Sequence, residues 1–395
     1  MKRIIFVIPS MANAGGAESL VSNLSSLLKE FYDVRIVSFD PIGTTSYFPL
    51  TVPFYPLGQG PKLPLVFRTF TYFSLAWRLY LTKRRLSVDI SISVLWRADL
   101  INSLSRGREK IISLVVINFL GNPSNVRMIQ LRFFVSFIFR RFDKILAITR
   151  QVSKEFNSLF CQDSGEVGVF RTFLPSPNST NIFLAPRNRF VFCGRAVAEK
   201  NIEGLLAVFE RSVRRDPDLQ LVIIGDGPSL GDMRSLAVRY GLTIGRDYRS
   251  TAQVLFVGTV DNPQDYMVGG CAFLMTSVHE GLPTVAILAA SLGLPMLVAD
   301  CKGGGMRDFF QLPDDEPDIE QSGTGLKVPS GLLLPIPSRS EPGTLEVWAR
   351  ALIEAATNDT LRRERVQGAL ELAFSYSPQA VLKEWRGVIE EVATT

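Results

Sequence analysis

A glutamate and a glycine, Glu280 and Gly281, stand between a predicted strand and a predicted helix in the second half of the chain. The strand is the apolar run Ala272–Met275, and the helix extends from Thr284 to about Leu292. Free N–H groups at the start of such a helix can bind an anion, and the helix dipole favours negative charge there. A carboxylate beside them can accept hydrogen bonds from sugar hydroxyls. A ligand that carries both a diphosphate and sugar hydroxyls is a nucleotide sugar. The simpler alternative is that Glu280 only caps the helix.

An arginine and a lysine, Arg195 and Lys200, follow the predicted strand Phe190–Cys193. The planar guanidinium can bind a phosphate through two hydrogen bonds, and the ammonium acts as a point charge. Hydrogen bonds to charged groups contribute roughly 1.5–3 kcal/mol each. We therefore expect the two cations to hold a diphosphate. The alternative is a basic loop that is only solvated.

Two glycines, Gly15 and Gly16, follow the first predicted strand, Lys2–Ile8, and precede a predicted helix over Ala17–Glu30. Because glycine lacks a Cβ, the backbone there can approach a ligand closely. The alternative is that the pair only makes the turn.

These segments together resemble the group 1 (family 4) retaining glycosyltransferases of GT-B fold. Four motifs occur in the family's order over nearly the whole chain: GGAE at 15–18, Gly-Arg followed by Lys-Asn within 194–201, GDGP at 225–228 and EGLP at 280–283. In the family, a second glutamate eight residues after the first usually holds the ribose hydroxyls of the donor. Here that position is Leu288, which is a departure from the pattern. A second departure is that the one histidine is His279, so the N-domain histidine of relatives is absent and Asn118 is the candidate in its place.

The resemblance implies catalytic roles for Glu280, Arg195 and Lys200, with no protein nucleophile, no metal and no cofactor. The positively charged clamp and the helix N–H groups would stabilise charge on the leaving diphosphate, and the acceptor would attack the sugar from the same face. The expected donor-binding residues are Gly15, Gly16, Arg195, Lys200, Gly225, Val260, Glu280, Gly281, Leu282, Pro283 and Thr284. The activity implied is metal-independent hexosyl or N-acetylhexosaminyl transfer, with UDP as the favoured nucleotide.

A chain of 395 residues with 46% hydrophobic content can form two domains, each with its own core. Apolar runs alternate with helical patterns, which predicts an α/β fold with parallel sheets. With the resemblance, this indicates two Rossmann-like domains facing a cleft. We place the acceptor-side domain at 1–175, a Pro-, Asn- and Ser-rich linker at 176–189, the nucleotide-sugar domain at 190–376, and a final helix at 377–395 that returns to the first domain.

The charge is uneven along the chain. Residues 1–185 carry 22 Lys and Arg against 11 Asp and Glu, whereas the remainder carries 21 against 27. The segments 62–86 and 126–144 combine aromatic and basic residues at helical spacing. They suit contact with an anionic membrane, and the alternative is that they are ordinary core helices with solvated basic faces. No motif supports a nucleic-acid partner.

A membrane-bound acceptor, such as a sugar on a polyprenyl diphosphate, fits these segments, and the resemblance then implies lipopolysaccharide or other surface polysaccharide biosynthesis. Four scattered cysteines without a C-x-x-C pattern indicate reduced thiols. The N-terminus imitates a signal peptide, but its apolar run is short and broken by Pro9. We therefore expect a cytoplasmic protein that is peripheral on the inner face of the membrane.

Two other classes of protein remain open. A degenerate member of the family would bind a nucleotide sugar, or a partner enzyme, without turnover, and Leu288 favours it. An epimerase of GT-B fold would act on a free nucleotide sugar, but it needs acid–base groups at the sugar, and the sequence has no evident carboxylate pair.

Overall fold

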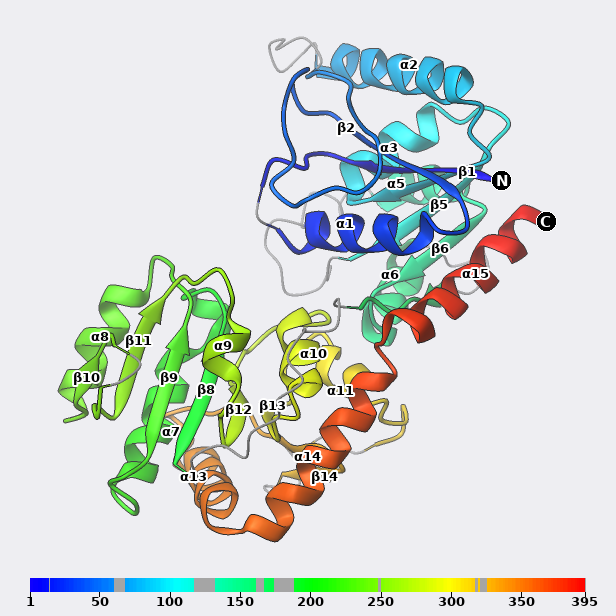
Figure 1. The fold of residues 1–395 in the computed structure, drawn as a ribbon. Coiled ribbons are helices and arrows are strands. Elements are labelled where there is room, and N and C mark those ends of the chain that lie inside the picture. Colours follow the sequence, from blue (N-terminus) through cyan, green and yellow to red (C-terminus); the bar gives the residue numbers. More distant parts are fainter. Residues whose placement is uncertain are drawn as a thin grey trace. The chain divides into compact units, whose positions relative to one another are not determined.

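The computed structural model describes residues 1–13, 15–59, 68–116, 132–160, 167–173, 188–247, 250–316, 319 and 325–394 (Figure 1). The chain divides into two compact units. Unit 1 consists of Met1–Phe173 and Pro378–Thr395, and unit 2 consists of Leu174–Ser377. Asn118 and most of the predicted linker lie outside the described residues.

Unit 1 is built on a seven-stranded parallel sheet with the order β3-β2-β1-β4-β5-β6-β7. The strands are β1 (Arg3–Ile8), β2 (Asp33–Ser38), β3 (Phe54–Pro56), β4 (Ile90–Val94), β5 (Lys110–Val115), β6 (Lys144–Ala147) and β7 (Gly168–Val169). The central strands are almost entirely buried, because helices cover both faces of a parallel sheet. The edge strand β3 lies within a Pro- and Gly-rich stretch and ends at Pro56, since an edge strand tolerates a proline.

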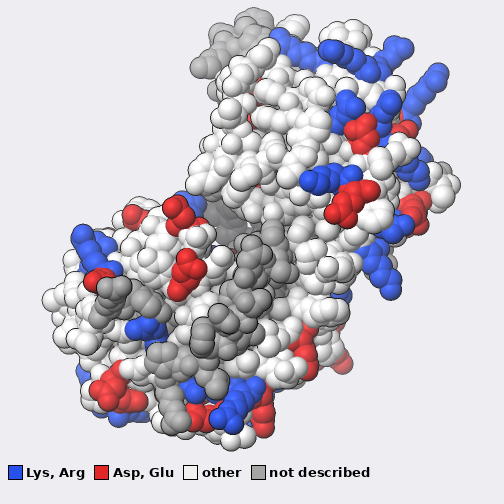
Figure 2. Space-filling model, viewed as in Figure 1, with Lys and Arg blue, Asp and Glu red and all other residues white. Residues whose placement is uncertain are grey.

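The helices described in unit 1 are α1 (Gly16–Leu28), α2 (Arg68–Leu86), α3 (Trp96–Leu104), α5 (Arg132–Phe139), α6 (Arg150–Phe160) and α15 (Pro378–Thr394). Helices α2 and α3 share one core with β1 and β2, and Leu75 and Ile101 are fully buried in it. Lys and Arg side chains lie over α2 on the surface of the unit (Figure 2). The sequence did not indicate α3, which begins directly after Leu95, a residue with the unusual φ of 73°.

The final helix, α15, packs on unit 1, as the resemblance implied. Val381, Trp385 and Ile389 are fully buried in the same core as β1 and α1. The indole of Trp385 lies against Phe170, with ring centroids 5.7 Å apart, and its N–H donates to the carbonyl of Arg171 at 3.4 Å. Two segments at opposite ends of the chain therefore form one hydrophobic core.

Unit 2 is built on an eight-stranded sheet with the order β10-β11-β9-β8-β12-β13-β15-β14. The strands are β8 (Arg189–Cys193), β9 (Gln220–Ile224), β10 (Ile244–Gly245), β11 (Val254–Gly258), β12 (Ala272–Met275), β13 (Met296–Ala299), β14 (Leu326–Val328) and β15 (Gly331–Leu334). The helices described are the 3₁₀ helix η3 (Ala198–Lys200), α7 (Ile202–Val213), α8 (Leu230–Arg239), α9 (Gln264–Met267), α10 (Thr284–Ser291), α11 (Gly305–Phe309), α13 (Pro342–Thr357) and α14 (Asp359–Phe374). The edge strand β14 runs antiparallel to β15, and the other pairings are parallel.

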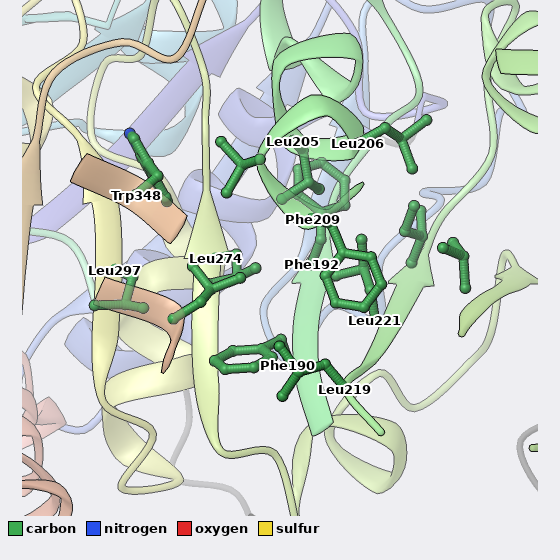
Figure 3. Close-up of a cluster of buried hydrophobic side chains, with 14 of the residues drawn as sticks. Phe190, Phe192, Leu205, Leu206, Phe209, Leu219, Leu221, Leu274, Leu297 and Trp348 are labelled. Atoms are coloured by element: carbon green, nitrogen blue, oxygen red, sulfur yellow. The ribbon is translucent and has the colours of Figure 1, made fainter. Parts of the chain in front are cut away.

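Large apolar side chains fill the space between this sheet and its helices. Phe190 and Phe192 of β8 lie near Phe209 of α7, in a core that also contains Leu274 of β12 and Trp348 of α13 (Figure 3). The indole N–H of Trp348 donates to the carbonyl of Pro335 at 2.7 Å, so this buried polar group is satisfied. On the other face, the core includes α10 and residues of α14. The central strands are thus held rigidly from both sides.

Each unit is Rossmann-like, which confirms the predicted α/β class. In unit 1 the chain reverses its direction of travel across the sheet between β1 and β4, and in unit 2 between β8 and β12. Ligands of open α/β sheets bind at the carboxyl ends of the strands at such switch points. In the part of the chain that the structure describes, no helix is long and apolar enough to cross a bilayer.

Candidate functional site

The switch point of unit 2 brings together the loops that follow β8 and β12, two adjacent strands. Lys200 ends η3 after β8, and Glu280 follows β12. The hydroxyl of Thr276 donates to the carbonyls of Lys200 and Asn201, at 3.2 and 3.1 Å. The amide of Val278 donates to the carbonyl of Glu199 at 2.8 Å. These bonds fix one loop against the other.

Lys200 Nζ forms an ion pair with Glu280 Oε1, although the two residues are 80 positions apart in the sequence. Ser277 Oγ donates to the same carboxylate oxygen at 2.7 Å. Among the described residues, no donor contacts Glu280 Oε2. The side chains of Lys200 and Glu280 are 22% and 11% exposed, so a ligand can reach them while the protein holds them in place.

The loop after β13 supports Glu280 from the other side. The Glu280 amide donates to the carbonyl of Lys302 at 3.0 Å, and the Lys302 amide donates to the carbonyl of Val278 at 2.9 Å. Gly305 begins α11 against this loop, and a Cβ on Gly305 would lie 1.4 Å from the carbonyl oxygen of Gly281. Gly305 is therefore required by close contact with the loop that carries Glu280. The preceding Gly303 and Gly304 have positive φ values of 100° and 70°, which favour glycine.

An ion pair that the sequence did not suggest fixes the same region. Arg307 Nε lies 3.0 Å from Asp300 Oδ1, and Arg307 Nη2 lies 2.6 Å from Asp300 Oδ2. Arg307 Nη1 also donates to the carbonyl of Glu316 at 2.9 Å. This bidentate pair ties the end of β13 to α11. The available signal was an acidic residue at the end of a strand and an arginine in the next helix. The glycines between them gave no indication that the two side chains would be close.

The loop after β8 is locked to the loop after β9. The Gly194 amide donates to the carbonyl of Ile224 at 2.9 Å, and the Ala196 amide donates to the carbonyl of Asp226 at 3.0 Å. Gly225 has a φ of 124°, and a Cβ there would lie 2.0 Å from the carbonyl oxygen of Gly194. Gly225 is thus required by the backbone. It holds in place the loop that presents Arg195.

The side chain of Arg195 is exposed and forms no hydrogen bond or ion pair with the described residues. Two cations, Arg195 and Lys200, therefore stand on the loop after β8. Only Lys200 has a carboxylate partner, Glu280. This arrangement leaves positive charge available to an anionic ligand.

Helix α10 begins at Thr284, directly after Pro283, whose ψ of 112° is extended. Thr284 is exposed and Leu282 is half-buried. Leu288 is also half-buried and packs against the core beneath α10. A hydrophobic side chain thus occupies the position at which relatives usually carry a second glutamate.

The remaining predicted donor residues lie in two different units. Val260 follows β11 at the same end of the sheet as Glu280 and is half-buried against the core. Gly15 and Gly16 belong to unit 1, where they follow β1 and begin α1. A Cβ on Gly15 would lie 2.1 Å from Glu18 Oε2, the end of a flexible side chain that can move aside. The role of these two glycines toward the donor stays a prediction.

Two thiols border the site and are not suited to be nucleophiles. Burial raises the pKa of Cys193 to about 11, although the charge of Lys200 opposes the shift. Burial also raises the pKa of Cys301 to about 12, and the charges of Glu280 and Asp300 add to this effect. Both thiols are therefore protonated at neutral pH, and the thiolate is the reactive form.

Known structures place this fold in a class. The structure is similar over the full length of both chains to a mutant of S. aureus TarM, solved in complex with Fondaparinux, alpha-GlcNAc-glycerol and UDP, with a TM-score of 0.72 at 13% identity. It is also similar to the lipopolysaccharide outer core galactosyltransferase WaaB in its apo form, with a TM-score of 0.65 and 17% identity over 98% of this chain and 99% of that one. The two parallel-sheet units thus define a protein of GT-B fold.

Sequence comparison finds a match to a family of glycosyltransferases. Residues 187–321 match the family model for group 1 glycosyl transferases. The chain is 22% identical to the amylovoran biosynthesis glycosyltransferase AmsD of Erwinia amylovora, over 98% of this chain and 100% of the relative. These matches confirm the resemblance to the group 1 glycosyltransferases that the motifs indicated.

Proposed function

We propose that the protein transfers a sugar from a nucleotide-sugar donor, with retention at the anomeric carbon, to an acceptor used in surface glycan synthesis. The observation that carries this proposal is the arrangement of Lys200, Glu280 and Arg195 at the switch point of unit 2. It combines positive charge for a diphosphate with a carboxylate for sugar hydroxyls. UDP is the proposed nucleotide, since TarM was solved with UDP.

Arg195 and Lys200 would bind the donor diphosphate. Their charges oppose the negative charge that builds on the leaving diphosphate as the bond to the anomeric carbon breaks. The N–H groups at the start of α10 add a positive dipole end. Because protein groups stabilise the leaving diphosphate in this scheme, the proposed reaction requires no metal.

Glu280 would orient the donor sugar. Ser277 and Lys200 hold its Oε1, so Oε2 can accept a sugar hydroxyl without loss of the contacts that position the side chain. The acceptor hydroxyl would attack from the face of the leaving group and pass its proton to the departing phosphate. The thiols of Cys193 and Cys301 are protonated, which supports a route without a protein nucleophile at those positions.

The proposed acceptor is a sugar on a polyprenyl diphosphate or a growing polysaccharide. AmsD is named for amylovoran biosynthesis and WaaB for the lipopolysaccharide outer core, so relatives act in surface glycan pathways. We propose unit 1 as the acceptor side and unit 2 as the donor side. The proposed location is the cytoplasmic face of the inner membrane.

A second candidate function is binding of a nucleotide sugar without turnover. The observation that favours it is Leu288, which packs against the core of unit 2 and supplies no carboxylate for the ribose. Against it stands the Lys200–Glu280–Ser277 arrangement, which holds a carboxylate at a defined place.

Two measurements distinguish the two candidate functions. A thermal-shift screen with UDP, GDP, ADP and their sugar conjugates tests donor binding, since ligand at about 100 times its Kd adds roughly 2.7 kcal/mol of stability. Transfer and retention are tested by incubating the protein with the stabilising nucleotide sugar and membrane extracts. NMR of the anomeric proton of the product then reports its configuration. Binding without any product favours the non-catalytic candidate. An inverted product contradicts the retaining mechanism, and no thermal shift with any nucleotide contradicts both candidates.

A further inference from the structure

Helix α2 has a second apolar face that points away from the sheet. Phe73, Trp77 and Leu81 are 63%, 62% and 47% exposed, and Phe70 one turn earlier is 63% exposed. The opposite side of the helix carries Leu75 and Leu79, both fully buried. One apolar face is enough to attach a surface helix to its domain. The other face therefore needs a separate explanation.

The exposed side chains form one stripe along the helix. Their positions, 70, 73, 77 and 81, advance by three, four and four residues, which keeps them on the same side of an α-helix. Trp77 also stacks on Tyr80, with ring centroids 5.6 Å apart. The stripe extends over most of α2, so it is a continuous apolar strip and not a single exposed residue.

Exposed apolar side chains also occur on the helices packed beside α2. Helix α3 packs beside α2, and α5 packs beside α3. Trp96 and Leu104 of α3 are 40% and 41% exposed, and Phe134 and Phe137 of α5 are 54% and 65% exposed. We call the exposed residues of these three helices the α2 layer surface: Phe70, Phe73, Trp77, Leu81, Trp96, Leu104, Phe134 and Phe137. An apolar surface formed by several helices marks an interaction site.

The charge around this surface is positive. The only acidic residue in α2, α3 and α5 is Asp99, which is 3% exposed. Arg84 and Arg85 are exposed at the end of α2, and Arg140 and Arg141 are exposed after α5. Figure 2 shows Lys and Arg side chains over α2. The surface therefore complements a partner with negative charge.

We infer that the α2 layer surface binds an anionic lipid bilayer. Phe, Trp and Leu side chains on one side of a helix enter the boundary between headgroups and acyl chains, while arginines bind lipid phosphates from the edge. Phe73, Trp77 and Leu81 supply the apolar contact, and Arg84 and Arg85 supply the charge. This inference deepens the proposed function, because it rests on a membrane-bound acceptor and names the surface that meets the membrane.

Flotation with vesicles tests the inference on the full chain. The protein is mixed with vesicles of phosphatidylcholine alone or with phosphatidylglycerol added. Wild type is expected to float only with the anionic vesicles. The triple variant Phe73→Ser/Trp77→Ser/Leu81→Ser loses binding, and Arg84→Gln/Arg85→Gln weakens it by about thirtyfold, since each arginine near the surface contributes about a fivefold effect. The side chains are exposed, so the fold is expected to survive both changes.

Matched controls come from unit 2. Phe374→Ser removes a phenylalanine that is 75% exposed on α14, and Arg363→Gln removes an exposed arginine of the same helix. Both should bind vesicles like wild type. Wild-type flotation by the variants of α2, or no flotation of wild type, overturns the inference. A concentration-dependent dimer in light scattering that the triple variant abolishes, without vesicle binding, would instead assign the surface to a second copy of the chain.

The same variants separate this inference from the proposed function. The thermal shift caused by the donor nucleotide depends on unit 2 and should be unchanged in all of them. Loss of vesicle binding with an unchanged nucleotide shift supports the membrane surface. If wild type does not bind vesicles but still shows the nucleotide thermal shift, the membrane inference is wrong and the proposed donor site is unaffected.

Discussion

The carboxylate of Glu280 forms an ion pair with the ammonium of Lys200, and Ser277 donates to the same oxygen at 2.7 Å. A group that would contact the sugar thus neutralises a group that would contact the diphosphate. A bound diphosphate must compete with Glu280 for Lys200. The pair therefore couples the two halves of the proposed donor site.

Replacement of Glu280 by glutamine tests this coupling. The amide keeps the size of the side chain but removes the charge, so Lys200 is fully available to a phosphate. We expect UDP to bind Glu280→Gln with equal or about fivefold higher affinity, since a partly exposed ion pair contributes up to about 1 kcal/mol. Sugar transfer should fall by at least about 100-fold, in the range seen when a transition-state contact is lost. Calorimetric titration with UDP measures the first effect, and a loss of UDP affinity as large as that of Lys200→Ala would contradict the coupling.

Leu288 provides a gain-of-contact experiment. In wild type no carboxylate from position 288 can hold the ribose, so UDP and 2′,3′-dideoxy-UDP should bind with similar affinity. Leu288→Glu should bind UDP about tenfold more tightly than the dideoxy nucleotide, because a hydrogen bond to a charged group contributes roughly 1.5–3 kcal/mol. Leu288→Gln is the size-matched neutral control. Equal affinities of Leu288→Glu for both nucleotides would show that position 288 does not face the ribose.

Gly305 is predicted to be necessary for the loop that carries Glu280. A Cβ at Gly305 would overlap the carbonyl oxygen of Gly281, which is backbone and cannot rotate away. Gly305→Ala should destabilise unit 2 by about 1–3 kcal/mol, the usual cost of forced overlap, and should impair transfer. Gly231→Ala in α8, where nothing lies within 4 Å of the new atom, is the control and should be neutral or slightly stabilising. Urea unfolding measures both, and equal stability of the two variants would contradict this account of the loop.

Asp99 predicts a pH dependence of stability in unit 1. It is fully buried, and desolvation raises its pKa from 3.8 to about 7, although the hydrogen bond from Ser93 opposes the shift. A raised pKa favours the protonated, folded form, so this contribution to stability is present below pH 4 and is lost as the pH rises to 7. Each pKa unit of difference corresponds to about 1.4 kcal/mol. Asp99→Asn should therefore gain stability relative to wild type between pH 4 and pH 7 in urea unfolding, and a constant difference over that range would contradict the assignment.

Sequence motifs predicted the fold and the strands before the candidate site residues because glycines, prolines and apolar runs act locally. The expected strands before Arg195 and Glu280 are present as β8 and β12. The contact between Lys200 and Glu280 was not predicted, since it depends on the order of strands in the sheet. Ser277 and Arg307 were missed for a similar reason, because a serine and an arginine carry little meaning until their partners are known.

The aromatic segment 62–86 shows that a sequence pattern alone does not assign the buried face of a helix. Its spacing predicted a helix, and residues 68–86 form α2. The periodicity could not tell which apolar side chains face the sheet, because α2 has apolar residues on two sides. Burial decides the matter, with Leu75 and Leu79 inside and Phe73 and Trp77 outside.

The most direct test of the donor site is calorimetric titration of UDP into wild type and into Arg195→Ala/Lys200→Ala. Wild type is expected to bind UDP, and the double variant is expected to lose at least about 100-fold in affinity, since two charge-assisted contacts of roughly 1.5–3 kcal/mol each are removed. Arg363→Ala and Lys327→Ala, which remove exposed cations from α14 and β14, should bind like wild type. If circular dichroism shows that the double variant is folded and titration shows wild-type affinity for UDP, then Arg195 and Lys200 do not bind the donor diphosphate.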